Sequence, residues 1–406
     1  MIYNFVIFLY VSAVHLAALF SEKVSKMVKG QKETFTILKQ HIDPSARYLW
    51  FHAASLGEFE QGRPLIEAIR KKYPEYKILQ TFFSPSGYEV RKDYKGADIV
   101  CYLPLDTPGN AKKFIELAHP YMAFFIKYEF WKNYLDELHS HHIQVYSISS
   151  VFRPGQIFFR WYGGCYKSAL QNFTHLFVQN EESVRLLKTI GISRTTIVGD
   201  TRFDRVLEIC SQSKDLPLIE QFKGNSLTLV AGSSWAPDED IFIPYFNSHP
   251  DMKLIIAPHV ISEGHIKEIM GKLSRTAVRY TEATEENVRQ ADCLIIDCFG
   301  LLSSIYRYGE ISYIGGGFGV SIHNTLEAAV YGIPVIFGPN NKKFIEAQGL
   351  KQCKGGFEIR GTEDFNALMD RFVSDRKFLA ESGKNSKDYV SANAGALAKI
   401  IQVVRL

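Results

Sequence analysis

The sequence predicts an α/β fold of two units, each with a parallel β-sheet covered by helices. Short apolar runs alternate with amphipathic stretches between about residues 47 and 178, which is typical of successive strand–helix repeats. The alternation starts again at residue 226, after a polar segment. The chain has 406 residues, which is enough for two domains with separate hydrophobic cores.

Composition narrows the class of protein further. Hydrophobic residues make up 46% of the chain, which favours a globular protein over a disordered one. Lysine and arginine number 47 against 43 acidic residues, so the net charge of +4 is too small to indicate a nucleic-acid partner. The 6 cysteines include no CxxC pair, which is typical of reduced thiols and not of a disulfide framework or a zinc site.

The N-terminal segment, residues 1–20, carries no formally charged side chain. Twenty helical residues span ~30 Å, about the thickness of one hydrocarbon core. Four lysines follow at positions 23, 26, 29 and 32, and positive residues favour the cytoplasmic side of a membrane and attract anionic headgroups. We therefore expect an N-terminal membrane anchor with the rest of the chain in the cytoplasm. The alternative is the buried first helix of a soluble domain.

The first domain is predicted over residues 43–205. Its expected strands are 47–51, 76–82, 99–103, 121–126, 143–148 and 174–178, and its expected helices are 59–72, 109–118 and 131–141. Residues 199–226 are polar and contain glycine and proline, so we expect the linker between the domains there.

The second domain is predicted over residues 225–385, followed by a C-terminal helix at 386–406. Its expected strands are 226–232, 253–257, 293–297, 311–315 and 333–337, with a helix beginning near Pro237, a residue suited to the first helical position. Parallel sheets of this kind bind ligands at the carboxyl ends of their strands, and two such units facing each other would enclose a cleft.

The stretch HAASLGE, residues 52–58, reads as strand, small-residue turn and helix. Gly57 tolerates backbone torsions that other residues avoid, and Glu58 falls in the first turn of the expected helix. A first-turn carboxylate contributes only ~0.3–1 kcal/mol to the helix through its dipole. The residues leave open whether Glu58 is such a charge or a catalytic base.

A glycine-rich stretch follows the strand at 311–315, with Gly315, Gly316, Gly317 and Gly319 before a helix expected near Asn324. Clustered glycines expose backbone N–H groups, and a helix N-terminus favours phosphate. Asn324 and Glu327 have the spacing of a capping box. The other interpretation is that Glu327 accepts hydrogen bonds from ribose hydroxyls.

Two more turns follow strands of the second domain. His259, after the strand at 253–257, is either a contact to a base or phosphate or an ordinary surface histidine; Gly300 marks the turn after 293–297. Three such turns on one sheet edge indicate a nucleotide pocket. In the first domain, residues 153–167 mix basic and aromatic side chains, which suits either a phosphorylated lipid at a membrane surface or an amphipathic helix packed on the core.

Several stretches, in order from about residue 50 to 340, carry a family resemblance. They are WFHAASLGEFEQGRPLIEAIRKKYP, TFFSPSGYE, YLPLDTPGN, YEFW, QNEES, VGDTRFD, AGSSW and HNTLEAAVYGIPVIFGP. Together they resemble the 3-deoxy-D-manno-octulosonic acid (Kdo) transferases, membrane-anchored enzymes that add Kdo to lipid A. The resemblance implies a GT-B glycosyltransferase fold with two Rossmann-like domains, an inverting mechanism, and neither a cofactor nor a required metal. It also implies CMP-Kdo as donor, a lipid A precursor as acceptor, and a place on the cytoplasmic face of the inner membrane.

The resemblance assigns roles to particular residues. The family's proton acceptor falls on Glu58, and the basic residue of its phosphate contact falls on Arg202, where many relatives have lysine. The family's nucleotide contacts fall on three segments, namely Pro258 and His259; Gly300, Leu301 and Leu302; and Asn324, Thr325, Leu326 and Glu327. Many relatives have arginine at the position of His259.

One departure from the family pattern concerns Lys127. Many relatives have two acids before a tryptophan, as Glu-x-Glu-x-Trp, whereas this chain has Lys127, Glu129 and Trp131. Two interpretations of Lys127 stay open. It contacts the Kdo carboxylate or an acceptor phosphate, or it is a solvated lysine near the end of a strand. Three alternatives to the whole function stay open: a sugar-nucleotide epimerase of the same fold, a lipid glycosyltransferase that uses a UDP-sugar, and a membrane-tethered binding protein.

Overall fold

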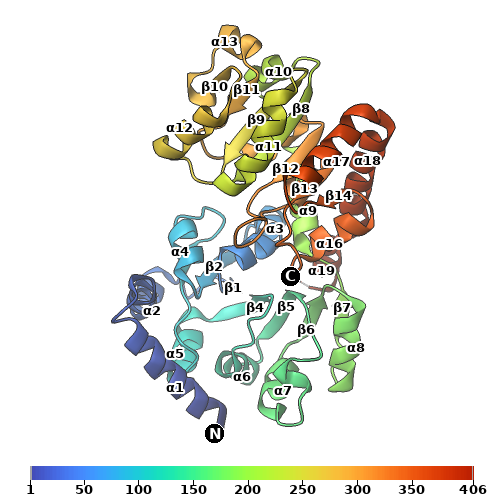
Figure 1. The fold of residues 1–406 in the computed structure, drawn as a ribbon. Coiled ribbons are helices and arrows are strands. Elements are labelled where there is room, and N and C mark those ends of the chain that lie inside the picture. The colour runs from blue at the N-terminus through green and yellow to red at the C-terminus, as the bar shows by residue number, and fades with distance from the viewer. Residues whose placement is uncertain (1, 405) are drawn as a thin grey trace. The chain divides into compact units, whose positions relative to one another are not determined.

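The computed structural model describes residues 2–404 and 406, and the chain divides into two compact units (Figure 1). The first unit comprises Met1–Asp204 and Gly395–Leu406, and the second comprises Arg205–Ala394. Residue 1 of the predicted anchor and residue 405 of the predicted C-terminal helix lie outside the described residues.

The first unit alternates strands and helices along most of its length. Its elements are α1 (Ile2–Ala17), α2 (Glu22–His41), β1 (Tyr48–Ala53), α3 (Leu56–Lys72), β2 (Lys77–Phe82), α4 (Pro85–Arg91), β3 (Ile99–Tyr102), α5 (Pro108–Ala118), β4 (Pro120–Ile126), α6 (Lys132–Ser140), β5 (Gln144–Ser150), the 3-10 turn η1 (Ile157–Phe159), α7 (Gly164–Gln171), β6 (His175–Val178), α8 (Glu181–Thr189), β7 (Thr195–Ile197) and, from the end of the chain, α19 (Ala396–Val403). Helix α9 (Thr201–Ser211) begins in the first unit and continues into the second.

The sheet of the first unit has the strand order β3-β2-β1-β4-β5-β6-β7, and all its strand pairs are parallel. Every residue of β1 is buried, because helices cover both faces of a parallel sheet. Trp50 packs into the core on one face, while Leu49 and Phe51 pack into the core on the other. Burial of each such side chain stabilises the fold by roughly 1.5–3 kcal/mol.

The second unit repeats this architecture. Its elements are α10 (Pro217–Lys223), β8 (Leu227–Ser234), α11 (Ala236–Ser248), β9 (Met252–Pro258), α12 (Glu263–Lys272), β10 (Ala277–Arg279), η2 (Tyr280–Glu282), α13 (Glu285–Gln290), β11 (Cys293–Ile295), α14 (Leu302–Ile305), η3 (Tyr306–Tyr308), β12 (Ile311–Ile314), α15 (Leu326–Ala329), β13 (Val335–Phe337), α16 (Ile345–Gln352), β14 (Gly356–Glu358), α17 (Thr362–Ser374) and α18 (Arg376–Asn393).

The second sheet has the order β10-β11-β9-β8-β12-β13-β14 and is also parallel throughout. The predicted α/β class with two parallel sheets is therefore confirmed. In both sheets the strand order reverses at a central strand, and ligands of doubly wound sheets bind outside the carboxyl ends of strands at that point.

The boundary between the units, after Asp204, falls within the predicted linker at 199–226, but that segment is not an irregular connection, because α9 and α10 occupy most of it. The polar residues of α9 belong to an amphipathic helix, and Pro217 stands at the start of α10, where its missing N–H costs no hydrogen bond. The single helix predicted at 386–406 is wrong. There, α18 ends at Asn393, and Gly395, with φ of 96°, separates it from α19.

Helix α19 is tied to the first unit by one carboxylate. Asp204 accepts hydrogen bonds from the backbone N–H groups of Gly395 (2.9 Å) and Ala396 (3.0 Å), at the start of α19. Ala396 and Ile400 then pack into the same core cluster as Leu49 and Phe51. A negative charge at a helix N-terminus is stabilising, so Asp204 acts as the cap of the last helix.

Helix α1 is shorter than the predicted anchor and ends at Ala17. Its Tyr3, Ile7 and Val14 are buried on one stripe, and the Tyr3 hydroxyl donates a hydrogen bond to Asp106. Within the described residues no single helix is long and apolar enough to cross a membrane. The pair α1 and α2, bent by 120°, passes that test together by length and composition only.

Candidate active site

Glu58 stands in the first turn of α3, directly after β1 and its small-residue turn. The Ser55 hydroxyl, at the N-cap position, donates a hydrogen bond to the Glu58 carboxylate and so holds it at the mouth of the helix. The Glu58 side chain is half-buried and is not turned into the core. It therefore lies at the carboxyl edge of the first sheet, where it can be reached from solvent.

Arg202 is oriented by a buried carboxylate that the sequence did not single out. Asp200, only 7% exposed, follows β7 and accepts hydrogen bonds from Arg202 Nη2 (2.8 Å) and from the Arg202 backbone N–H (2.9 Å). The side-chain amides of Gln61 (3.0 Å) and Gln179 (3.2 Å) donate to the same carboxylate. The two glutamine amides thus fix the Asp200 carboxylate, and that carboxylate in turn holds the Arg202 guanidinium, whose Nε also donates to it (3.1 Å).

The charges around Asp200 determine its ionisation. Burial acts to raise the pKa of Asp200, but the Arg202 guanidinium and then the Lys127 ammonium outweigh burial and hold that pKa below its usual value. The carboxylate therefore stays ionised at neutral pH. Lys127 and Arg202, two of the predicted site residues, consequently lie in the electrostatic environment of one carboxylate at the same sheet edge.

Lys127 follows β4 in a left-handed backbone conformation, with φ of 64°. For a residue with a β-carbon this conformation costs of the order of 1–2 kcal/mol. Two hydrogen bonds stabilise it, one from the Lys127 N–H to Ile148 O (2.9 Å) and one from Ser150 Oγ to Lys127 O (3.0 Å). Such local strain is a feature of functional sites, which favours a role for Lys127 beyond that of a solvated surface lysine.

Glu129, the acid that remains of the family pair, belongs to a second network at this edge. Its Oε2 accepts a hydrogen bond from Trp131 Nε1 (2.6 Å) and lies 3.1 Å from Nε2 of the fully buried His52. The other ring nitrogen of His52 lies 2.9 Å from Thr81 Oγ1. His52 belongs to the predicted turn sequence, but its partners come from β2 and from the segment after β4, so no local spacing revealed the network.

In the second unit, the predicted nucleotide contacts lie at the ends of neighbouring strands. Pro258 ends β9, the segment of Gly300 follows β11, and the segment of Asn324 follows β12. Since β11, β9, β8 and β12 are adjacent in the sheet, these three segments share one edge. The structure therefore brings the predicted residues together at the carboxyl edge of the second sheet.

His259 is the middle ring of a three-ring stack that the sequence did not predict. The rings of His259 and Trp235 are 4.6 Å apart at 26°, and those of His259 and His323 are 4.4 Å apart at 25°. Trp235 Nε1 also donates a hydrogen bond to His323 Nε2 (3.2 Å). Burial, and then the neighbouring His259, lower the pKa of His323 to about 4.

Trp235 and His323, the outer rings of the Trp235–His259–His323 stack, line a cavity of about 280 Å³ together with the glycine loop after β12. Offset-stacked rings of this kind offer a flat surface to another planar group. The stack therefore adds Trp235 and His323 to the candidate nucleotide site. The clue in the sequence was weak, because the three residues are separated by 24 and 64 positions.

The glycine loop after β12 was expected to offer free backbone N–H groups to a phosphate, but some of these groups already have partners. The N–H of Gly315 donates to Gly232 O (2.9 Å), and the N–H of Gly316 donates to the Asp238 carboxylate (2.9 Å). A β-carbon at Gly315 would lie 2.2 Å from Ser233 O, and one at Gly317 would lie 2.5 Å from Gly338 N. These glycines therefore allow loops to pack closely, and two of the expected donors are already used.

The predicted capping box of Asn324 and Glu327 does not form in that register, because Thr325 is the N-cap of α15. Asn324 Oδ1 accepts a hydrogen bond from Leu326 N (3.1 Å), and Asn324 Nδ2 donates to Glu327 Oε1 (2.9 Å). The asparagine thus holds the Glu327 carboxylate through a side-chain contact. At the neighbouring turn, Gly300 has φ of 88°, and Leu301 is the N-cap of α14.

Comparisons with known proteins show what the whole chain is similar to. Residues 29–205 match the family model described as 3-Deoxy-D-manno-octulosonic-acid transferase (kdotransferase). A 3-deoxy-D-manno-octulosonic acid transferase of Aquifex aeolicus (strain VF5) is 28% identical over 346 residues, covering 83% of this chain and 89% of the relative. One of Rickettsia bellii (strain RML369-C) is 26% identical over 393 residues, covering 93% of this chain and 92% of the relative.

The chain is thus similar to Kdo transferases over most of its length.

Among solved structures, UDP-GlcNAc 2-epimerase from Neisseria meningitidis bound to UDP-GlcNAc covers 87% of this chain and 98% of its own length, with a TM-score of 0.62 and 14% identity. That likeness supports the GT-B fold alone. In this chain, Glu58, Lys127 and Arg202 lie at one edge of the first sheet, and the predicted nucleotide contacts lie at one edge of the second. Their roles stay predictions.

Proposed function

We propose that this chain transfers Kdo from CMP-Kdo to a lipid A precursor, with inversion at the transferred carbon, in lipopolysaccharide synthesis. The observation that carries the proposal is Glu58, which has the family's base position and a half-buried carboxylate at the carboxyl edge of a parallel sheet. Similarity to Kdo transferases across nearly the whole chain supports the choice of donor and acceptor.

In the proposed reaction, Glu58 removes the proton from the acceptor hydroxyl as that oxygen attacks the anomeric carbon of Kdo. A sugar hydroxyl is a weak nucleophile until its proton is removed, and a positioned general base contributes about 10²–10⁴-fold to the rate. The bond from the anomeric carbon to the CMP phosphate breaks in the same step, so CMP leaves with the bonding electron pair. The hydrogen bond from Ser55 keeps the carboxylate in place for this transfer.

The leaving phosphate gains negative charge as the bond breaks, and a fixed cation stabilises that charge. Arg202 is the proposed cation, because Asp200 and the two glutamine amides hold its environment rigid. On the second unit, the Trp235–His259–His323 stack is the proposed platform for the flat base of CMP, and Glu327 is the proposed acceptor for ribose hydroxyls.

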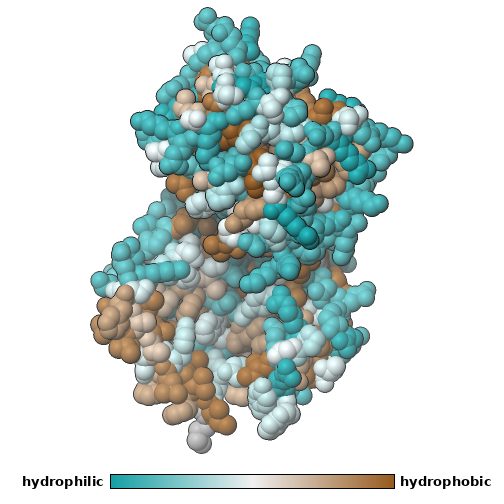
Figure 2. All heavy atoms as spheres, in the orientation of Figure 1, coloured by the Kyte–Doolittle hydropathy of each residue, from teal (hydrophilic) through white to brown (hydrophobic). Residues whose placement is uncertain are grey.

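We also propose that α1 attaches the enzyme to the cytoplasmic face of the inner membrane. Its apolar residues outside the buried stripe are exposed, among them Ile2 (80%), Phe5 (64%) and Phe8 (65%), and Figure 2 shows hydrophobic side chains gathered where α1 lies. An exposed apolar helix face of this kind fits a membrane surface. The lysines of α2 would then meet anionic headgroups.

Aromatic residues of the segment 153–167 also support the proposed membrane contact. The ring of Tyr3 on α1 lies 5.5 Å from that of Tyr166 on α7. Trp161, five residues before Tyr166, is 94% exposed. Phe158 of the same segment is buried in the core. The mixed segment 153–167 therefore divides its aromatic residues between the core and the surface, and Trp161 is suited to a membrane interface.

The decisive test is mass spectrometry of a lipid A precursor after incubation with the enzyme and CMP-Kdo. Addition of one or more Kdo masses is expected, with release of CMP. A parallel reaction with UDP-sugars distinguishes a different donor, and a reaction with nucleotide sugar alone reveals epimerisation. Absence of any Kdo adduct, with the acceptor presented in detergent and in vesicles, would contradict the proposed function.

A further inference from the structure

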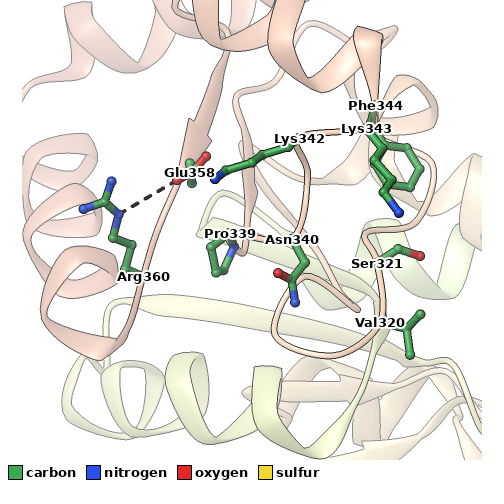
Figure 3. A pocket seen from close by; sticks show the side chains of 9 residues that line it. All are labelled: Val320, Ser321, Pro339, Asn340, Lys342, Lys343, Phe344, Glu358 and Arg360. Carbon is green, nitrogen blue, oxygen red and sulfur yellow. Dashed lines mark ion pairs between the residues drawn. The ribbon is translucent and has the colours of Figure 1, made fainter. Parts of the chain in front are cut away.

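A second cavity of the second unit, of about 530 Å³, lies at the ends of β13 and β14 and the loop after β12. Its lining includes Val320, Asn340, Lys342, Lys343 and Arg360 (Figure 3). The strands β12, β13 and β14 are neighbours in the sheet. The cavity therefore occupies the carboxyl edge of that sheet, where parallel sheets bind ligands, but contains none of the predicted nucleotide contacts.

Hydrogen bonds between loops fix the shape of this cavity. Asn340 donates from its backbone N–H to Gly317 O (3.0 Å) and from Nδ2 to Gly319 O (2.6 Å). The fully buried Asn341 donates to Gly338 O (2.9 Å) and accepts from Gln348 Nε2 (2.7 Å). The loop that carries Lys342 and Lys343 is thus anchored at its base to the glycine loop and to α16.

The acidic residue of the cavity, Glu358, is already compensated. Its Oε2 accepts hydrogen bonds from Lys351 Nζ (2.7 Å) and Asn341 Nδ2 (3.0 Å). The hydrogen bond from Lys351, and then that from Asn341, hold the pKa of Glu358 below its usual value. Glu358 therefore stays ionised, and its charge is balanced by a lysine outside the cavity lining.

Three cationic side chains remain with their charge available. Within residues 2–404 and 406, neither Lys342 nor Lys343 forms a side-chain hydrogen bond or ion pair, and both side chains are exposed. The Arg360 guanidinium is 82% exposed and approaches Glu358 only to 3.9 Å. Figure 3 shows Lys342 extending toward Glu358 and Arg360, and Lys343 extending toward Ser321. The cavity therefore carries an excess of positive charge.

Two further features suit an anion. The helix α16 begins directly after Phe344, a lining residue, so the positive end of its dipole adds to the charge of the lysines. Arg360 offers a planar fork of donors and the lysines offer mobile point charges, which together match the oxygens of a phosphate or carboxylate.

We propose that this cavity binds the oxyanion of an acidic or phosphorylated saccharide. Two ligands supply that chemistry, the carboxylate of the donor sugar acid and a phosphate of the glycolipid acceptor. The choice of these two ligands rests on the proposed function, whereas the anion site rests only on the cavity and its charges.

The anion site is tested on the full chain with inorganic pyrophosphate as probe. Lysine acetylation is followed by mass spectrometry at Lys342 and Lys343, with Lys267 and Lys377 as controls, because these lie on exposed helices beside a glutamate one turn away. Pyrophosphate is expected to slow labelling at Lys342 and Lys343 and leave the control lysines unchanged. If Lys342 and Lys343 are labelled at the same rate with and without pyrophosphate, the anion site is overturned.

A pair of double variants then identifies the ligand. Lys342→Ala/Lys343→Ala is compared with Lys267→Ala/Lys377→Ala, which removes the same charge elsewhere on the second unit. Loss of two charge-assisted contacts is expected to raise one KM about tenfold or more in the first variant only. A higher KM for CMP-Kdo identifies the sugar carboxylate, and a higher KM for the lipid identifies the acceptor phosphate.

The outcomes separate this proposal from the proposed function. If labelling is protected but both KM values stay unchanged, the anion site stands and its assignment to a saccharide is overturned. If the wild-type chain transfers no Kdo at all, the proposed function fails, and the labelling experiment still decides the anion site. Matching thermal unfolding curves confirm that both double variants fold.

Discussion

The two sheets end in edges of opposite character. At the first edge, Asp200 and Glu129 are ionisable groups held by several hydrogen bonds, and Lys127 and Arg202 stand beside Asp200. At the second edge, stacked rings and the glycine loop border one cavity, and cationic side chains line another. The same architecture therefore supports two different local chemistries.

The difference has a physical basis. A proton acceptor or a charge that stabilises a transition state must be fixed before the reaction, so its side chain needs neighbours that hold it. A binding surface for a flat base or an anion needs open space, a planar face and unspent charge. The first edge is thus suited to catalysis and the second to holding the donor, and substitutions at the two edges should change different kinetic constants.

The largest effect is expected from Glu58→Gln, which keeps the shape of the side chain and removes its ability to accept the proton. We expect kcat to fall about 10²–10⁴-fold, the contribution of a general base, with KM for CMP-Kdo nearly unchanged. Glu116→Gln on α5, where the glutamate is exposed beside Lys112, is the matched control. A Glu58→Gln enzyme with a near-normal rate would remove the base role.

Arg202→Met should affect both stability and rate. Without the guanidinium, the buried Asp200 carboxylate loses its main compensating charge, so unfolding free energy is expected to fall by about 1–3 kcal/mol. In the wild-type chain the lowered pKa of Asp200 gives stability above its unfolded pKa, which is lost as pH falls through the folded pKa. Arg202→Met should weaken that dependence.

Denaturant unfolding at several pH values measures this effect. Arg185→Met is the control, since Arg185 pairs with Glu182 at the surface, where such pairs contribute about 0–1 kcal/mol. Arg202→Lys should keep part of the stability and rate, because charge is retained without the fork of donors. Equal stability losses in Arg202→Met and Arg185→Met would show that Asp200 does not depend on its partner.

Trp235→Ala should act on binding and not on chemistry. Stacking of a base on an aromatic ring contributes about 1–3 kcal/mol, so we expect KM for CMP-Kdo to rise about tenfold with kcat nearly constant. Trp235→Phe keeps a ring but not the hydrogen bond to His323, and an intermediate KM is expected. An unchanged KM in Trp235→Ala would show that the base binds away from the Trp235–His259–His323 stack.

The smallest effect concerns pH and His323. Because the pKa of His323 falls from its usual value near 6.5 to about 4, the folded chain binds fewer protons than the unfolded chain between these values. Its contribution to stability is complete above about pH 6.5 and is lost as pH falls toward 4. His323→Asn should flatten Tm against pH in this window, whereas the exposed His139→Gln should not.

The strands that the sequence predicted correctly are the long buried ones. β1, β4 and β9 have almost every residue buried, so each forms an apolar run that stands out from its surroundings. The strands β7, β10 and β14 were missed, because each has only three residues and lies at or near the end of a sheet, where its side chains are half-exposed. Short runs of mixed polarity carry no clear period.

The site residues divide in the same way. Glu58 was identifiable because its turn, its helix and its family motif are local in sequence, and Arg202 because it lies in a quoted motif. The sequence could not reveal that Asp200 gathers several hydrogen-bond donors, or that Trp235 and His323 stack with His259. These contacts join segments that are far apart in the chain. Only the folded sheet brings them together.

The cap that Asp204 places on α19 has a consequence for synthesis of the protein. The second unit is one continuous stretch, but the first is completed by the last helix of the chain, whose Ala396 and Ile400 fill its core. The first unit therefore exposes a gap in its apolar interior until the last helix has been made and has docked. A chain cut off just before α19 would hold an aggregation-prone N-terminal half beside a C-terminal unit with all its elements.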